Sequence, residues 1–207
     1  MKPKNIKKLG NIVSTAADII HIGAHKGQEA WIYEKFGQHN VFWIEAIPEI
    51  YEQLKENLKE YPKQFAINEL VTDKVNKKYK FYLSNNNLES SSIFDFSNEW
   101  WKKKSVYHKN SIILKSNTLD NIYKKYNMDK YYIDLLIIDV QGAELLVLKG
   151  ADEILSKINW IYTEYSVMPV YKDGVMWPEL KKHLNEKGFY NTKEPTRKHG
   201  NILFERK

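Results

Sequence analysis

The chain of 207 residues contains no cysteine, which excludes structural disulfides and thiolate chemistry. It is also poor in arginine, since only Arg197 and Arg206 occur among 32 basic residues. Arginine favours bidentate recognition of phosphate and guanine, whereas lysine is a point charge. The lysines alternate with Asp and Glu along expected helices, so the formal charge of +6 indicates a solvated surface more strongly than a nucleic-acid interface.

Long apolar runs, low-complexity tracts and internal repeats are absent as well. The basic amino terminus is followed by apolar residues that Asn11, Ser14 and Asp18 interrupt, so neither a signal peptide nor a membrane span is expected. We expect a soluble, cytoplasmic protein with a single domain over residues 1–207. The sequence leaves the oligomeric state open.

The chain does contain a regular alternation of buried strands and amphipathic helices. Apolar runs predict strands at 18–22 and 41–44, and each is followed by an expected helix, at 28–36 and 48–59. Further strands are expected at 64–68, 78–83, 111–115, 134–138, 158–164, 189–191 and 202–205, and further helices at 119–126, 143–156 and 176–187. This alternation predicts an α/β fold with a parallel sheet, edged by an antiparallel hairpin of the last two strands.

Two carboxylates follow the most hydrophobic of these strands. Asp139 stands where strand 134–138 ends, and Glu144 lies in the first turn of the next expected helix. Ligands of open α/β sheets gather at the carboxyl ends of strands, so Asp139 is placed to meet a substrate. Capping of the helix is the simpler interpretation for Glu144, because a carboxylate there favours the helix dipole.

A strand, a glycine turn, a helix, a second strand and an acid form the mononucleotide-binding half of a Rossmann-like fold. Glu45 follows Gly23 by 22 positions, close to the separation at which a carboxylate reaches a ribose over the first turn. His25 stands where a dinucleotide fold needs its second glycine, and it would crowd a pyrophosphate. A phosphate-free nucleoside fits better, and S-adenosylmethionine is the common one. An ordinary tight turn at Gly23, and a surface carboxylate at Glu45, stay open as alternatives.

The block 137–151 closely resembles the hallmark of the FkbM family of S-adenosylmethionine-dependent methyltransferases. Residues 21–29 are similar to the first motif of that family, and residues 44–48 to its ribose-binding strand end. Later family landmarks are similar to residues 90–93, 117–120, 163–166 and 202–204, so that the resemblance covers about residues 18 to 206.

The resemblance implies a class I methyltransferase fold, a Rossmann-like three-layer sandwich around a mostly parallel, seven-stranded sheet. It also implies transfer of a methyl group to oxygen, most often in sugars, glycolipids or natural products. The cofactor-binding residues that it implies are His21, Gly23, Ala24, Gly27, Glu45, Ala46, Asn68, Glu69, Leu70, Asp139 and Val140. His21 replaces the usual aspartate and His25 the usual asparagine, which predicts weaker or pH-dependent cofactor affinity.

We expect Asp139 to act as the general base or to orient the acceptor hydroxyl. The segment 85–108 is the candidate lid or acceptor site, although its aromatic residues could equally pack this long loop onto the sheet. The expected substrate-binding residues are Ser91, Ser92, Trp100, Trp101, His108, Glu144 and Glu164. Mg²⁺ held by Asp139, Glu144 and Glu164 is a competing route, but no spacing in the sequence requires a metal.

Two rival functions remain open from the sequence. A nucleic-acid 2′-O-methyltransferase would use the basic surface, and its binding would weaken steeply with salt. A non-catalytic Rossmann-like binding module would have lost its active site, and the replacement at His21 lends that interpretation some weight. A nicotinamide dehydrogenase is least favoured because of His25. The preferred acceptor is a sugar, a glycan or another small molecule with a hydroxyl, and the sequence names neither the acceptor nor the position methylated.

Overall fold

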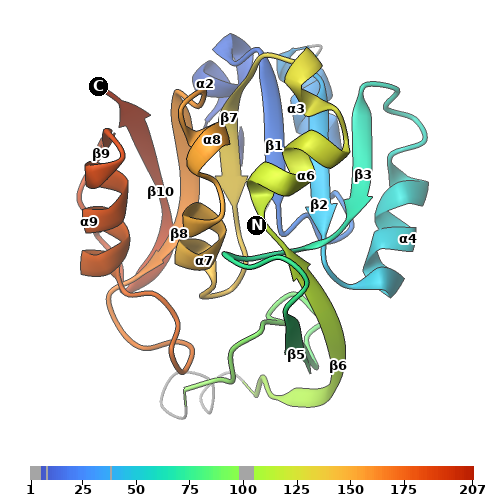
Figure 1. Ribbon diagram of the computed structural model, residues 1–207, viewed down its shortest axis with the longest axis vertical. Coiled ribbons are helices and arrows are strands. Elements are labelled where there is room, and N and C mark those ends of the chain that lie inside the picture. Colours follow the sequence, from blue (N-terminus) through green and yellow to red (C-terminus); the bar gives the residue numbers. More distant parts are fainter. Residues whose placement is uncertain (1–5, 8, 38, 98–104) are drawn as a thin grey trace.

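The computed structural model describes residues 6–7, 9–37, 39–97 and 105–207, and it contains a central seven-stranded sheet (Figure 1). Its strands, in spatial order, are β3 (Gln64–Asn68), β2 (Val41–Glu45), β1 (Asp18–Ile22), β7 (Ile133–Ile138), β8 (Trp160–Ser166), β10 (His199–Arg206) and β9 (Phe189–Asn191). Strand β10 is antiparallel to both neighbours, and the pairs from β3 to β8 are parallel. The predicted α/β sheet with its antiparallel C-terminal hairpin is confirmed.

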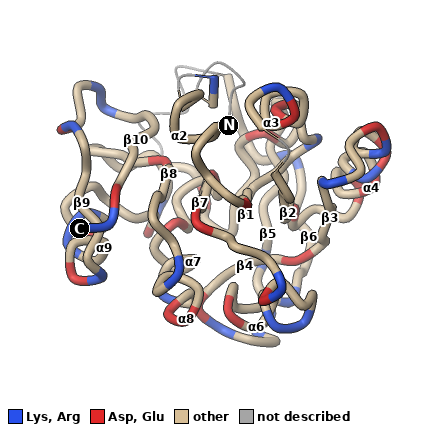
Figure 2. Tube along the Cα trace, turned by 90° about the horizontal axis from the view of Figure 1, so that it is seen from above, with Lys and Arg blue, Asp and Glu red and all other residues tan. Residues whose placement is uncertain are grey.

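Helices cover both faces of this sheet and complete a three-layer sandwich. Figure 2 shows α2 (Gly10–Thr15) and α3 (Ala30–Phe36) on one side, and α6 (Leu119–Lys125), α7 (Glu144–Lys149) and α8 (Asp152–Leu155) on the other. Helix α4 (Pro48–Asn57) packs mainly on the first side, helix α9 (Trp177–Glu186) packs on the second, and a short 3-10 helix, η2 (Met128–Lys130), follows α6. Strand β1 serves both cores, because Ile20 and Ile22 face one side and Ile19 the other.

Local sequence explains where several helices begin. Pro48 occupies the first turn of α4, where its missing N–H costs no hydrogen bond, and Ile50 and Leu54 form the buried face. The Thr118 side chain caps α6 by accepting a hydrogen bond from the Asn121 N–H. The amino terminus of α8 is capped from a distance, since the Asp120 carboxylate accepts from the N–H groups of residues 153 and 154.

The single helix expected at 143–156 is wrong, because the structure divides it into α7 and α8 at Gly150. A Cβ at Gly150 would lie 2.3 Å from the Thr72 carbonyl oxygen, so only glycine permits the backbone of residues 72–73 to pass there. The apolar periodicity continues through both short helices, which is why the pattern alone predicts one long helix.

A second, three-stranded sheet lies beyond the carboxyl ends of β1 and β2 (Figure 1). It consists of β4 (Leu70–Val71), β6 (His108–Asn117) and β5 (Lys78–Ser84), with β6 in the middle, and we call it the small sheet. The strands expected at 78–83 and 111–115 are present, but they belong to this sheet and not to the main one. Its inner face packs through Leu70 and Phe81 against Ile47 and Ala143. Within the described residues, no helix is long and apolar enough to cross a membrane.

Candidate active site

The site begins where strands β1 and β7 end side by side. The Asp139 N–H donates a hydrogen bond of 2.9 Å to the Ile22 carbonyl, which brings Gly23 directly against the Asp139 backbone. Gly23 has φ +80°, and a Cβ there would lie 1.8 Å from the Asp139 carbonyl oxygen. Glycine is therefore required both by the left-handed conformation and by the close approach of the two strand ends.

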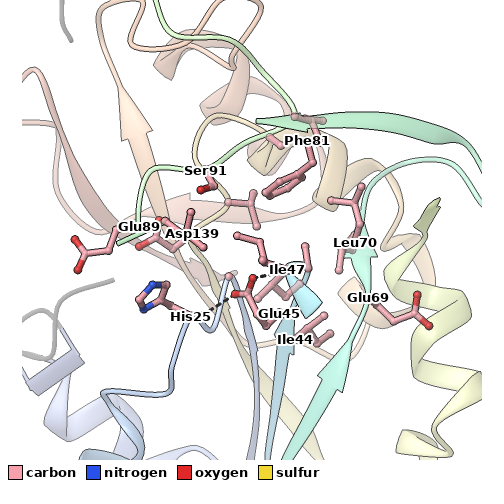
Figure 3. Close-up of a pocket in the computed structure, with 18 residues that line it drawn as sticks. His25, Ile44, Glu45, Ile47, Glu69, Leu70, Phe81, Glu89, Ser91 and Asp139 are labelled. Carbon is pink, nitrogen blue, oxygen red and sulfur yellow. Dashed lines mark hydrogen bonds between the residues drawn. The ribbon is translucent and has the colours of Figure 1, made fainter. Parts of the chain in front are cut away.

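A pocket of about 590 Å³, including the open solvent at its mouth, lies between these strand ends and the small sheet (Figure 3). We call it the donor pocket. Its floor is formed by the ends of β1, β2 and β7, and its roof by β4, β5 and the segment 88–93. No lysine or arginine occurs among its described lining residues, whereas four carboxylic acids do, namely Glu45, Glu69, Glu89 and Asp139. The pocket therefore suits an apolar or cationic ligand and offers a phosphate neither lysine nor arginine.

Glu45 is fixed in the donor pocket by two backbone groups. One carboxylate oxygen accepts from the His25 N–H and the other from the Ile47 N–H, each at 2.8 Å (Figure 3). Burial raises the pKa of Glu45, while these hydrogen bonds oppose that shift. Each carboxylate oxygen has two lone pairs, so Glu45 keeps acceptor capacity for a ligand hydroxyl.

Asp139 is linked to a second acidic group through a glutamine. The Gln141 amide nitrogen donates to Asp139 Oδ1 at 2.5 Å and to Glu164 Oε2 at 3.1 Å. The Gln141 amide oxygen accepts from the Tyr171 hydroxyl at 2.6 Å, and its backbone carbonyl accepts from Ser92. Gln141 also has φ +57°, a left-handed conformation that is uncommon outside glycine, so several contacts hold this residue in place.

A second pocket of about 280 Å³, open solvent included, lies on the far side of Gln141 from the donor pocket. We call it the second pocket. It is lined by Gly142, Glu144, Glu164, Tyr165, Ser166, Val170, Tyr171, Gly174, Val175 and His199. Strand β10 contributes His199, whose Nε2 lies 3.2 Å from Glu164 Oε1. Burial alone would lower the pKa of His199, but the hydrogen bond and charge of Glu164 raise it overall.

The buried carboxyl of Glu144 holds the loop that precedes its own helix. Its Oε1 accepts from the N–H groups of Val140 and Gly142, at 3.3 and 3.1 Å, and both residues lie before α7. The capping interpretation is wrong, because no side chain among the described residues caps α7. Burial and the nearby charge of Glu164 raise the pKa of Glu144 to about 8. Burial, followed by the charge of Asp139, also raises the pKa of Glu164. Glu144 is thus mainly a neutral acid at pH 7 and retains a proton that it can donate.

The residues expected to bind the cofactor do not all line the donor pocket. Those that do are Gly23, Glu45, Ala46, Glu69, Leu70, Asp139 and Val140. Asn68 instead supports the end of β2, because its side chain donates to the carbonyls of Glu45 and Ala46. The Glu69 carboxylate turns away and accepts from Lys125 at 2.6 Å. Ala24 is buried in the core beneath the turn, and a Cβ on Gly27 would meet Leu54 at 2.7 Å.

His21 lies outside the described lining of the donor pocket and inside the core. Its Nδ1 is 3.0 Å from the Tyr33 hydroxyl, and its ring stacks on Trp43 at 4.6 Å. Burial lowers the pKa of His21 to about 3, so the residue is neutral at pH 7. The predicted pH-dependence of cofactor affinity therefore has no source in this side chain. His25 lies at the pocket mouth, where its Nε2 is 2.8 Å from the Asn87 carbonyl.

The described residues among the expected acceptor-binding ones are distributed over four places. Ser91 lines the donor pocket, Ser92 binds Gln141, and His108 stacks between Tyr82 and Phe96. His108 also lies 3.0 Å from Asp95, so it fastens the described part of the long segment to β6. Glu144 and Glu164 line the second pocket. Trp100 and Trp101 lie outside the described residues.

The three carboxylic acids considered for Mg²⁺ do not form a metal-binding cluster. Over the described ranges, no group of three or more His, Cys, Asp or Glu side chains has the geometry to hold a metal ion. The amide of Gln141 lies between Asp139 and Glu164 and donates to both, so it takes the place where a shared cation would have to lie.

Two residues that shape this region were missed from the sequence, namely Gln141 and His199. Gln141 stands inside the hallmark block, but nothing in the pattern shows that its side chain bridges two acids. His199 carries no signal in the sequence, because its position beside Glu164 depends on the antiparallel pairing of β10 with β8. Tyr171 is different, because the residues after the strand at 158–164 predict a second possible wall of the acceptor site, made of Tyr165, Met168, Tyr171 and Trp177.

The amino-acid sequence of the chain is similar to those of known methyltransferases. The sequence profile of the Methyltransferase FkbM domain matches residues 21–190. The chain is 27% identical over 161 residues to the 2-O-methyltransferase NoeI of Sinorhizobium fredii (strain NBRC 101917 / NGR234), covering 74% of this chain. It spans 65% of the length of NoeI, slightly less than two thirds.

Two solved structures are similar in fold at low sequence identity. Magnesium protoporphyrin IX methyltransferase (ChlM) from Synechocystis PCC 6803, with bound SAM, matches with TM-score 0.52 and 9% identity, over 99% of this chain and 79% of that chain. A putative tRNA (m1A22) methyltransferase of Streptococcus pneumoniae, in complex with S-adenosyl-L-methionine, matches with TM-score 0.55 and 12% identity, over 100% and 73%.

The sheet order and these similarities define a class I methyltransferase fold, as the sequence predicted. Because the profile covers most of the chain, the protein belongs to the FkbM family of S-adenosylmethionine-dependent methyltransferases. The family resemblance predicted from the block 137–151 is confirmed.

Proposed function

We propose that this protein transfers the methyl group of S-adenosylmethionine to a hydroxyl of a sugar or glycan. The observation that carries the proposal is the chain of hydrogen bonds that joins the two pockets. Asp139 lines the donor pocket, and through Gln141 it is connected to Glu164 in the second pocket. A methyl acceptor in the second pocket would thus approach the donor past a buried carboxylate.

The donor pocket fits a sulfonium nucleoside better than a phosphorylated one. The carboxylates of Glu45 and Asp139 complement a positive charge. The apolar wall of Leu70, Phe81 and Ile93 offers a surface for a flat base. Bound there, S-adenosylmethionine supplies an electrophilic methyl group. Glu45 is the residue that would accept from ribose hydroxyls, and the glycine turn at Gly23 allows the ligand to lie close to the backbone.

Asp139 is proposed as the group that accepts the proton of the acceptor hydroxyl. A hydroxyl is a poor nucleophile at neutral pH, so removal of its proton as the new bond forms assists the transfer. Gln141 acts through Asp139 as a positioning residue, because its amide donates to one carboxylate oxygen and so fixes the orientation of the carboxylate. This arrangement aligns the reacting atoms in advance.

The second pocket supports a polyhydroxy acceptor. Glu164 offers carboxylate oxygens that accept from hydroxyls, and Glu144, with a pKa of about 8, can donate its proton. Tyr171 adds an aromatic wall of the kind that packs on the apolar face of a sugar ring. The relative NoeI, named a 2-O-methyltransferase, supports oxygen as the methylated atom.

A nucleic-acid acceptor is less favoured. Neither pocket has a lysine or arginine among its described lining residues, and His199 is already paired with Glu164, so backbone phosphates would find little positive charge at the reaction site. Methylation of RNA that weakens steeply with salt would favour that rival.

Two measurements test the proposal. Calorimetry with S-adenosylhomocysteine should show binding that Glu45→Ala abolishes and that the exposed control Glu194→Ala retains. Transfer of radiolabelled methyl from S-adenosylmethionine to a panel of oligosaccharides should then identify modified hydroxyls. A protein that ignores S-adenosylhomocysteine would be a non-catalytic binding module, and one that binds it but methylates only RNA would contradict the sugar acceptor.

A further inference from the structure

The outer face of the small sheet carries lysines that have no acidic partner among the residues the structure describes. Strands β5 and β6, with sequences KYKFYLS and HKNSIILKSN, contain no Asp or Glu. Lys78, Lys80 and Lys115 are exposed, and none of the three forms an ion pair with any residue that the structure describes. Elsewhere on the surface lysines do pair with acids, as on α4 and α6, so this face is chemically distinct.

The strand register places two of these lysines directly opposite each other. Lys78 pairs with Lys115, and Lys80 pairs with Ile113, so all four side chains share one face. Like charges directly opposite on adjacent strands are destabilising. The sheet therefore retains a repulsive pair at a position where an acid would stabilise it, and an external anionic surface would relieve that repulsion.

An exposed apolar residue lies among the lysines. Ile113 is 65% exposed, and Val75, in the loop just before β5, is 50% exposed. The opposite face of the same strands is buried, since Phe81 and Ile112 pack in the core above the donor pocket. A face that is basic, contains a protruding aliphatic side chain and backs onto the active site suits the headgroup layer of an anionic membrane.

We propose that the basic face, formed by Lys78, Lys80, Ile113 and Lys115, docks the enzyme on an anionic phospholipid bilayer. The lysines lie against lipid phosphates, and Ile113 enters the boundary between headgroups and acyl chains. Docking brings the roof of the donor pocket, and hence the reaction site, close to the membrane plane. This inference does not depend on the acceptor, because it concerns where the enzyme binds and not what it methylates.

Nucleic acid is a weaker candidate for the same face. Neither arginine of the chain lies on the small sheet, and lysine alone does not provide bidentate recognition. An aliphatic side chain at the centre of the face contributes to lipid insertion but not to contact with phosphates.

The test is co-sedimentation of the full chain with vesicles made of equal parts phosphatidylglycerol and phosphatidylcholine, and with vesicles of phosphatidylcholine alone. The protein should bind the mixed vesicles, release them at high salt and ignore the neutral ones. Each lysine near an anionic surface contributes about fivefold to partitioning, so Lys78→Gln/Lys80→Gln/Lys115→Gln should lower the partition coefficient roughly 100-fold. A control with the same net charge is Lys130→Gln/Lys193→Gln/Lys198→Gln, three exposed lysines outside the small sheet, which should change it much less.

Two further variants keep the test decisive. Ile113→Ser leaves the charge unchanged and should weaken vesicle binding several-fold while leaving any binding to poly(U) RNA unaltered. Lys115→Glu should raise the midpoint of thermal unfolding, because it replaces the repulsive cross-strand pair with an attractive one, and should weaken vesicle binding. The proposal is overturned if the wild-type protein does not bind the mixed vesicles, or if both triple variants lose vesicle binding equally. It is also overturned if Ile113→Ser binds vesicles like the wild type while the lysine variants lose binding to RNA.

Discussion

The donor pocket and the second pocket are neighbours on either side of Gln141, yet they are built in different ways. In the donor pocket the key acid, Glu45, is held by backbone N–H groups, and the close approach at Gly23 is between two backbones. In the second pocket Glu164 is held by the side chains of Gln141 and His199, which come from distant parts of the chain. The first pocket is therefore fixed by the fold, whereas the second depends on which side chains the loops present.

This difference separates what the fold provides from what determines specificity. A pocket built from strand ends and backbone groups can serve the same donor in many proteins, because side-chain replacement changes it little. A pocket built from titratable side chains can be altered by single substitutions. We therefore expect substitutions in the donor pocket to act by changing its geometry. Substitutions in the second pocket should act by changing its charge, and should be seen in the KM for the acceptor.

The largest effect is expected at the boundary between the two pockets. Asp139→Asn keeps the shape and the contact with Gln141 but removes the base, so kcat should fall by about 10²- to 10⁴-fold. Affinity for S-adenosylhomocysteine, measured by calorimetry, should change little. Glu89→Gln, at the mouth of the donor pocket, is the charge-matched control. Unchanged turnover in Asp139→Asn would remove this carboxylate from the mechanism.

Two glycines of similar conformation can test whether the donor pocket requires close contact between two backbones. Gly23 has φ +80° and Gly188 φ +82°, but a Cβ at Gly188 meets only the end of Arg206, at 3.5 Å. Gly188→Ala should cost about 1–2 kcal/mol of the free energy of unfolding through its left-handed φ alone. Gly23→Ala adds a clash with the Asp139 carbonyl and should cost about 2–5 kcal/mol. Chemical denaturation measures both, and equal costs would contradict the tight packing of β1 on β7.

Charge in the second pocket predicts a pH-dependence of stability. The pKa of Glu144 is raised to about 8 in the folded protein, so the folded state holds a proton that the unfolded state has lost above pH 4.5. The free energy of unfolding should therefore fall between pH 4.5 and 8, by up to about 1.4 kcal/mol per pH unit for this proton.

Glu144→Gln removes this proton from the balance, so the stability of the variant relative to wild type should rise with pH over the same window. Denaturation at pH 5 and pH 8 measures the difference, and Glu179→Gln, an exposed residue in the first turn of α9, is the control. A constant difference at both pH values would show that Glu144 is ionised in the folded protein.

The smallest predicted effect concerns Tyr171. Tyr171→Phe removes the hydroxyl that donates to Gln141 while keeping the aromatic wall, which should cost about 0.5–1.5 kcal/mol, or two- to tenfold in acceptor KM. Donor affinity should stay the same, since Tyr171 is absent from the described lining of the donor pocket. Equal losses for donor and acceptor would mean that the two pockets are not separable.

Much of the fold could be predicted because it depends on local patterns. Buried apolar runs alternating with amphipathic helices determine a parallel sheet, and Gly23, Glu45 and Asp139 meet because the ends of parallel strands share one edge. The small sheet could not be placed in this way, since its strands look like any half-exposed strands until their partners are known. The break at Gly150 depends on a distant backbone passing beside it.

The sequence predicted the residues of the candidate site only where the position of the backbone alone brings them together. The sequence could not show toward which face of the sheet the His21 side chain points. Both faces of β1 are buried, and the strand has apolar residues on each, Ile20 and Ile22 on one and Ile19 on the other. The network around Gln141 joins residues 92, 139, 164 and 171, and no spacing in the sequence encodes that meeting. Side-chain constellations of this kind follow from tertiary packing.

His25 joins the β1 turn to the segment above the donor pocket. Its Nδ1 faces the Gln28 amide and its Nε2 faces the Asn87 carbonyl, each at 2.8 Å, so the imidazole links the turn after β1 to the segment around Asn87. In a chain without native thiols, one cysteine introduced by Glu89→Cys would carry a single fluorophore in the lining of the donor pocket. The emission of that fluorophore would report changes in its surroundings when a ligand enters the donor pocket.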